Sequence, residues 1–176
     1  NGLFAIAYQM ESYLVLLVNN LSTSFDPQIT QSYTAKDFNR CYILVSNTTR
    51  YSILIMLLFT FPLFINIEFV LKLWLGTIHS GVLTLCYWAL VSLFVRSLTS
   101  GIPPLIIATG NVRSFQISTT ILMIIGLPIS YFFFQLGFPY HTILIIMTIL
   151  DFINRLFLIV LVGKITNFNI FSFFNN

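Results

Sequence analysis

The sequence predicts an all-α protein, a bundle of helices that crosses a membrane several times. Only 7% of its 176 residues are charged, whereas 57% are hydrophobic. A soluble domain carries about 25% charged residues, so a water-soluble fold could not cover its surface with this composition. The composition therefore excludes a soluble enzyme, a nucleic-acid-binding protein and a disordered chain.

Five segments are long and apolar enough to cross a bilayer as a helix, which takes about 20 residues. They cover approximately residues 3–23, 42–71, 82–108, 115–136 and 142–162. Ile, Val and Phe are frequent in them, but in lipid only a helix or a closed barrel satisfies every backbone group. The alternating pattern of barrel strands is absent. Residues 1–176 are thus predicted to form one transmembrane domain without a soluble module.

The first two predicted spans flank the longest polar stretch of the chain. Residues 24–41 follow the first span and include Asp26, Lys36, Asp37 and Arg40. Because four charges interrupt an otherwise apolar sequence, this stretch is predicted to be the one substantial loop. The second span has its most apolar block at residues 51–71 and extends backward to residue 42.

The third predicted span contains a run of helix breakers, Gly101-Ile102-Pro103-Pro104. Proline has no backbone N–H and its ring clashes with the preceding turn, so this run is expected to interrupt the helix. Broken helices in transporters mark places where a bundle bends or lines a cavity. Gly101, Pro103 and Pro104 are therefore candidate hinge residues. The alternative is a packing kink without a functional role.

The last two predicted spans are joined by a turn signal, Gly137-Phe138-Pro139. Their orientation, and that of the whole bundle, follows from Lys and Arg near the span ends, which favour the cytoplasmic side. One side holds Lys36, Arg40, Arg113 and Lys164, with Arg50 nearby, and the other holds Lys72. This excess places the C-terminus in the cytoplasm. With five spans Asn1 then lies outside, which predicts that further helices precede it.

Ionisable residues inside the spans are candidates for function, because a charge in a membrane is costly unless it is paired or faces water. Glu11 lies in the first span, Arg96 near the middle of the third, and Asp151 and Arg155 in the fifth. Arg96 has no acidic residue within a turn, so it is expected to face a cavity or another helix. Glu11 is either its partner or an independent site. Asp151 and Arg155 lie four residues apart, so a self-neutralising pair is the alternative for them.

The remaining charged residues of the spans lie nearer their ends. Arg50 is expected close to the inner headgroups, and Glu68 and Lys72 at the outer interface, where long side chains reach water. No spacing of His, Cys, Ser or acidic residues matches a catalytic, phosphate-binding or metal-binding motif. Neither an enzyme nor a resident cofactor or metal is expected.

Four short stretches, in this order, resemble one family of transporters. They are residues 19–33 (NNLSTSFDPQITQSY), residues 71–76 (LKLWLG), Pro103-Pro104 followed by Ala108-Thr109-Gly110, Arg113 and Gln116, and residues 127–131 (LPISY). The chain resembles bacterial polysaccharide flippases, which belong to the multidrug/oligosaccharidyl-lipid/polysaccharide exporter superfamily. The resemblance runs over about residues 5–165, nearly the whole chain.

The resemblance implies that the five spans are the last five of about twelve helices in a two-lobe transporter, an incomplete C-terminal lobe. It implies the flipping of a polyprenyl-pyrophosphate-linked oligosaccharide across the bacterial inner (cytoplasmic) membrane for O-antigen, capsule or exopolysaccharide synthesis. The expected partners are this lipid-linked oligosaccharide, membrane lipid and a coupling ion, either sodium or a proton.

On this interpretation the charged residues would handle the substrate. Arg96, Arg50 and Arg155 would attract the anionic head group, while Glu11 and Asp151 would tune that field or couple transport to an ion. Two alternatives stay open. A cation-coupled multidrug exporter of the same superfamily would favour an acidic cavity, whereas three arginines against two acids favour an anionic lipid. A non-transporting membrane scaffold or anchor would need none of these charges.

Overall fold

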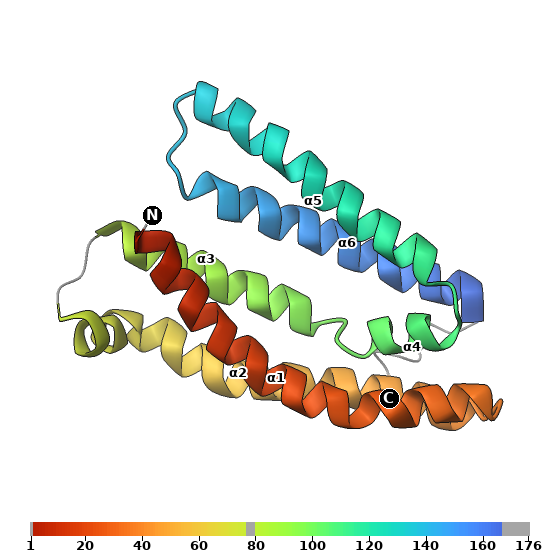
Figure 1. Cartoon of the computed structure of the whole chain (residues 1–176). Helices are drawn as coiled ribbons and strands as arrows, with labels where there is room; N and C mark the ends of the chain where they lie inside the picture. Colours follow the sequence, from red (N-terminus) through yellow and green to blue (C-terminus); the bar gives the residue numbers. More distant parts are fainter. Residues whose placement is uncertain (1, 77–79, 167–176) are drawn as a thin grey trace.

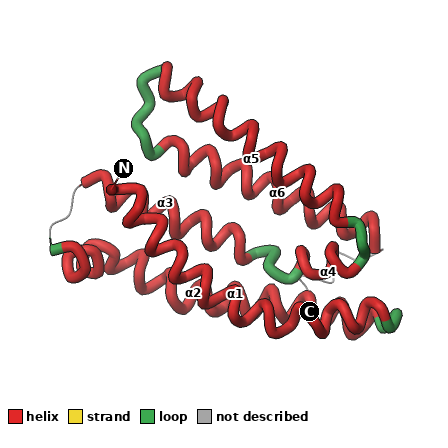
Figure 2. Tube along the Cα trace, in the orientation of Figure 1, coloured by secondary structure: helices red, strands yellow, loops and turns green. Residues whose placement is uncertain are grey.

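The computed structural model describes residues 2–76 and 80–166, and they are almost entirely helical. The helices are α1 (Gly2–Thr34), α2 (Phe38–Leu75), α3 (Ser80–Ser97), α4 (Ile102–Ala108), α5 (Val112–Gln135) and α6 (Thr142–Thr166) (Figure 1). Within those two ranges there is no strand (Figure 2). The all-α prediction is confirmed.

Most of these helices are suited to a membrane. Among the described residues α2, α5 and α6 are each long and apolar enough to cross one, and α3 with α4 forms a further candidate span, bent by 45°. These helices support the prediction of a helical membrane protein. The predicted first span lies in α1, which is not among the candidate spans found in the described residues. A fifth span therefore stays a prediction.

The prediction of a long loop at residues 24–41 is wrong. Helix α1 continues through this stretch to Thr34, and α2 already begins at Phe38. The turn between them is closed by Lys36 in the left-handed backbone region and by Asp37, whose Oδ1 accepts a hydrogen bond from the Arg40 amide at 3.2 Å. Asp37 thereby caps α2 in the usual way.

Tertiary packing explains why α1 stays helical so far. Phe25, Ile29 and Tyr33 are spaced four residues apart, so they share one face of the helix. Ile29 is fully buried with Cys41 and Val45 of α2, and Phe25 and Tyr33 pack against the same cluster. This burial stabilises the last three turns of α1, although Pro27 and the polar neighbours favour a loop.

The predicted interruption of the third span is confirmed. Helix α3 ends at Ser97 and α4 begins at Ile102, so that Pro103 and Pro104 fall in the first turn of α4. At that position a helix has no partner for its N–H groups, so proline is tolerated. The break therefore precedes the prolines. The hinge role of Gly101, Pro103 and Pro104 stays a prediction.

The break is held against α2 at close range. The Gly101 amide donates a hydrogen bond of 3.1 Å to Thr49 Oγ1 on α2. A Cβ atom at Gly101 would meet the Val45 carbonyl oxygen and would lie 2.9 Å from Thr49 Oγ1. Only glycine can approach the α2 backbone this closely.

Thr49→Val is expected to destabilise the fold by about 1–2 kcal/mol, because it leaves the buried Gly101 amide without an acceptor. The unfolding free energy in mixed micelles measures this loss. Thr48→Val is the matched control, since Thr48 is equally buried but, among the described residues, its hydroxyl bonds only to the Leu44 carbonyl of its own helix. An equal loss in both variants would contradict the assigned role of Thr49.

Helix α2 bends at a second place. Asn66 has non-helical backbone angles (φ −111°, ψ 22°), and its side chain donates to the Pro62 carbonyl at 3.2 Å. The bend thus lies one turn after Pro62, a proline inside the helix. In contrast, α5 continues through Pro128 as one helix.

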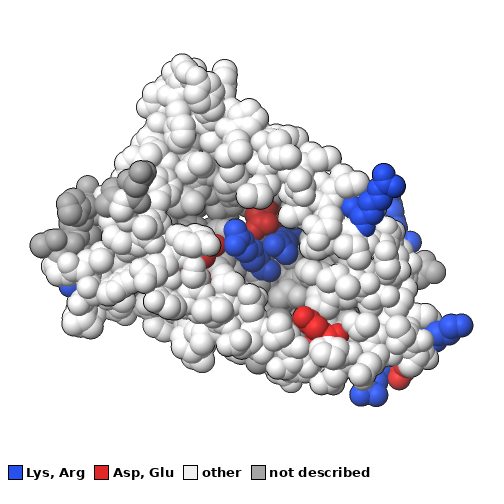
Figure 3. Space-filling view, viewed as in Figure 1, with Lys and Arg blue, Asp and Glu red and all other residues white. Residues whose placement is uncertain are grey.

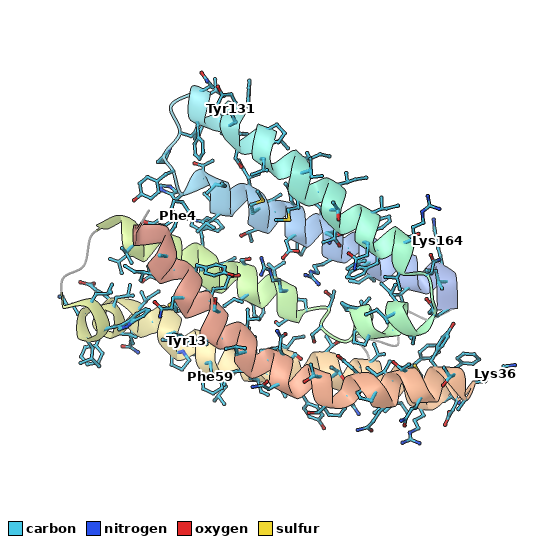
Figure 4. The ribbon with its side chains drawn as sticks, in the orientation of Figure 1. Phe4, Tyr13, Lys36, Phe59, Tyr131 and Lys164 are labelled. Atoms are coloured by element: carbon cyan, nitrogen blue, oxygen red, sulfur yellow. The ribbon has the colours of Figure 1, made fainter. Side chains whose placement is uncertain are left out.

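The two ends of the bundle differ in charge. Lys36 and Lys164 lie at one end, whereas Phe4 and Tyr131 lie at the opposite end (Figure 4). The α1–α2 turn and the α4–α5 turn also lie at the first end (Figure 1). This arrangement agrees with the basic side predicted from the sequence. The cytoplasmic location of that end stays a prediction, and residues 167–176 of the tail lie outside the described residues.

Candidate functional site

Arg96 connects three helices at the middle of the bundle. From α3 its Nη1 donates to Glu11 Oε1 on α1 at 3.0 Å, and its Nε donates to Asp151 Oδ2 on α6 at 2.9 Å. Both carboxylates are largely buried, with side chains 17% and 19% exposed, whereas the Arg96 side chain is 48% exposed. Arg96 thus pairs with buried acids and still reaches open space.

Arg155 completes this arrangement from the next turn of α6. Its Nη2 lies 3.4 Å from Asp151 Oδ1, and its Nη1 donates to Thr99 Oγ1 at 3.3 Å. Thr99 belongs to the break between α3 and α4. Both carboxylate oxygens of Asp151 are therefore shared between two guanidinium groups. We refer to Glu11, Arg96, Asp151 and Arg155 as the charge network.

The charge network is balanced, with two arginines and two acids. A charge inside a membrane protein is costly, and pairing with an opposite charge removes most of that cost. The pairing confirms two of the possibilities raised by the sequence, since Glu11 is the partner of Arg96 in space and Asp151 pairs with Arg155. Asp151 also pairs with Arg96, which spacing alone does not indicate.

A cavity of about 330 Å³ lies beside the charge network. Its walls come from α1 (Val15, Val18, Asn19, Thr23, Asp26), α2 (Met56), α3 (Leu93, Arg96, Ser97), the break (Ser100), α4 (Pro103, Pro104, Ile107) and α6 (Arg155). In the space-filling view, acidic and basic side chains gather in a hollow at the middle of the face (Figure 3). The cavity is thus mostly apolar, with charges at defined places.

Asp26 is a cavity residue that the sequence analysis placed in a loop. Its Oδ1 is buried without a hydrogen-bond partner, and in the described residues Asp26 forms no ion pair. It lies beyond the predicted first span, and burial raises the pKa of its carboxyl. The spacing of Asn19, Thr23 and Asp26 places them on one helical face. That signal would have revealed Asp26 if the helix had been extended past Thr23.

Not every predicted site residue joins this group. Arg50 is exposed on α2, does not line the cavity, and forms no ion pair within the described ranges. Glu68 and Lys72 form an exposed pair at 3.6 Å, in agreement with an interfacial position. Of the candidate hinge residues, Pro103 and Pro104 line the cavity.

The arrangement neutralises charge within the bundle, since each acid of the network lies against an arginine. Within residues 2–76 and 80–166, no group of three His, Cys, Asp or Glu residues could hold a metal ion. Comparison with models of known protein families, with curated proteins and with solved structures found no match to this chain.

Proposed function

We propose that the chain belongs to a membrane transporter that flips a polyprenyl-pyrophosphate-linked oligosaccharide across the bacterial inner membrane. One observation carries the transport part of this proposal: a paired charge network opens onto a cavity inside a bundle of apolar helices. The substrate class rests on the resemblance of the sequence to polysaccharide flippases.

The physical chemistry supports this choice. A pyrophosphate-linked sugar cannot enter hydrocarbon, so its passage needs a path with polar and cationic groups. Arg96 is half-exposed at the cavity, and Arg155 lies one turn away from its partner Asp151. The bent α3–α4 segment, whose prolines line the cavity, offers a place for the bundle to change shape between two states.

A cation-coupled multidrug exporter of the same superfamily is the second candidate. The charged residues in and beside the cavity favour it more strongly than the charged residues chosen from the sequence did. Arg50 stays away from the cavity, whereas Asp26 joins it. The charge network and cavity together therefore hold Arg96 and Arg155 against three acids, Glu11, Asp151 and Asp26. An acidic surplus attracts cations, either as substrates or as coupling ions. A non-transporting scaffold would show no effect of these charges.

Deletion of the gene in its source bacterium tests the proposal without assuming a particular sugar. Loss of surface polysaccharide is expected, with recovery when the complete gene product that contains this chain is supplied. The charge-balanced variant Arg96→Gln/Glu11→Gln keeps the Asp151–Arg155 pair and is expected not to restore it. Arg50→Gln is the control and is expected to restore it, because Arg50 does not line the cavity.

Unchanged surface polysaccharide in the deletion strain would refute the flippase. Increased sensitivity to cationic drugs in that strain would then identify the exporter. Full restoration by Arg96→Gln/Glu11→Gln would show that the charge network does not contribute to transport, as expected of a scaffold.

A further inference from the structure

A second cavity lies next to the charge network. It has a volume of about 360 Å³, and its walls come from α1 (Phe4, Ala5, Ala7, Tyr8, Glu11), α3 (Ala89) and α6 (Leu144). We call it the second cavity, and the cavity that Arg96 lines the first cavity. Among the described residues, no side chain lines both. The two cavities are therefore separate in this structure.

The two cavities follow one another along α1 and α3. On α1 the wall of the second cavity ends with Glu11, and the wall of the first begins with Val15, about one turn later. On α3, Ala89 lines the second cavity and Leu93, again one turn later, lines the first. The boundary between the cavities thus lies at the same level on both helices.

The charge network lies at this boundary. Glu11 lines the second cavity and Arg96 lines the first, although their side chains are only 3.0 Å apart. On α6, Asp151 lies between Leu144, which lines the second cavity, and Arg155, which lines the first. On each of the three helices a member of the network therefore marks the point where one cavity ends and the other begins.

The charge network can divide at one contact without leaving a charge unpaired. Glu11 and Arg96 join α1 to α3, whereas Asp151 and Arg155 both belong to α6. If the 2.9 Å contact between Arg96 Nε and Asp151 Oδ2 opens, each half keeps one acid and one arginine. An unpaired charge inside a membrane is costly, so the network separates most easily at this contact between α3 and α6.

Helix α6 is held more firmly after Asp151 than before it. Leu158 and Val162 are buried in an apolar cluster with residues of α1, α2 and α4, and the Tyr42 hydroxyl of α2 donates to the carbonyl of the last α6 residue at 2.6 Å. Before Asp151, Leu144 packs against the apolar cluster of α1, α2 and α3, but it is only partly buried. The first half of α6 can therefore move while its second half stays in place.

We infer that the contact between Arg96 and Asp151 is a gate between the two cavities. The gate is closed in this structure. It opens when the first half of α6 moves away from α3, which joins the cavities into one passage along α6. The inference rests on the transport part of the proposed function and does not depend on the class of substrate.

The variant Asp151→Asn/Arg155→Gln tests the gate, because it removes both charges of α6 and leaves the other pair of the charge network intact. Glu68→Gln/Lys72→Gln is the matched control. It removes an acid–base pair with the same spacing of four residues on α2, which is exposed and lines neither cavity.

Distances between spin labels report the position of α6. Labels at Tyr13→Cys on α1 and Ile149→Cys on α6 are each two residues from the acid of their own helix, at exposed positions. The complete gene product is measured in lipid nanodiscs, with the native Cys41 and Cys86 replaced by alanine. A longer distance is expected for less than about 10% of the parent molecules and for most molecules of the Asp151→Asn/Arg155→Gln variant.

A second pair of labels reports the end at which α6 is held. Lys36→Cys and Lys164→Cys place these labels at the basic end of the bundle (Figure 4). Their distance is expected to be the same in the parent and in the Asp151→Asn/Arg155→Gln variant. The control variant on α2 should match the parent with both pairs of labels.

Two outcomes would overturn the inference. If the monodisperse variant keeps the parent distances between Tyr13→Cys and Ile149→Cys, the contact between α3 and α6 is not a gate. If both pairs of labels move apart together, α6 leaves the bundle as a whole and the assigned motion is wrong. Should the double variant not yield monodisperse protein, Asp151→Asn, which keeps the shape of the side chain, takes its place with the same expectations. Either failure leaves the flippase standing, because restoration of surface polysaccharide tests that proposal separately.

Discussion

Arg96→Gln is expected to destabilise the folded bundle by about 2 kcal/mol. The substitution leaves Glu11 without its cation and Asp151 with Arg155 alone. Breaking a fully buried pair costs about 3–5 kcal/mol, and the smaller value applies because the Arg96 side chain is 48% exposed. Unfolding of the purified protein in mixed micelles, followed by circular dichroism, measures the difference.

A second substitution tests whether the unpaired acid causes this loss. Arg96→Gln/Glu11→Gln removes one charge of each sign and is expected to recover most of the lost stability. Arg50→Gln, which changes an exposed arginine, should leave the unfolding free energy within about 0.5 kcal/mol of the parent. A single variant Arg96→Gln that is as stable as the parent would mean that the charge network does not hold α1, α3 and α6 together.

Gly101→Ala is expected to destabilise the protein by about 2–3 kcal/mol and to reduce the yield of folded protein in the membrane. The new methyl group would meet the Val45 carbonyl oxygen and lie 2.9 Å from Thr49 Oγ1. A carbonyl oxygen of the α2 backbone cannot move aside as a side chain can, so the α3–α4 break would have to separate from α2. The fraction of monodisperse protein after extraction, and its unfolding free energy, report the effect.

Gly126→Ala is the matched control for this substitution. Gly126 is also buried, and its new methyl group would lie 2.8 Å from Met147 Sδ and 3.1 Å from Leu150 Cδ1 on α6. These atoms end flexible side chains, which can rotate away, so a loss below about 1 kcal/mol is expected. If both alanine variants lose the same stability, the backbone contact at Gly101 is not the cause.

The sequence was sufficient to predict those features of the fold that depend on local chemistry. Long apolar runs predicted helices, and the glycine–proline run predicted the break after α3. The end of α1 was missed because Pro27 and its polar neighbours favour a loop in isolation. Its stability comes instead from the burial of Ile29 against Cys41 and Val45, which is decided by packing.

In the candidate site, too, local contacts could be predicted from the sequence and long-range contacts could not. The spacing of Asp151 and Arg155 revealed their pairing, but the contact of Arg96 with Glu11 joins residues 85 apart in the sequence and needs the three-dimensional fold. Arg50 illustrates the opposite error, because a charge in an apolar segment does not show which face of the helix it occupies. Arg50 is exposed on α2 and does not line the cavity, so the cavity has fewer cations than the sequence analysis predicted.

The length of the α1–α2 hairpin has a mechanical consequence. Helix α1 has 33 residues, and α2 runs from Phe38 to its bend at Asn66, which correspond to about 50 Å and about 43 Å at 1.5 Å per residue. The hydrocarbon core is about 30 Å thick, so both segments exceed it by about 10 Å or more. Because the buried side chains at the shared turn keep the two helices together, the excess forms a rigid arm. The Gly101 amide is hydrogen-bonded to Thr49 on this hairpin. A small change of angle at the α3–α4 break is therefore expected to produce a larger displacement of the α1–α2 turn, because displacement grows with distance from the point of rotation.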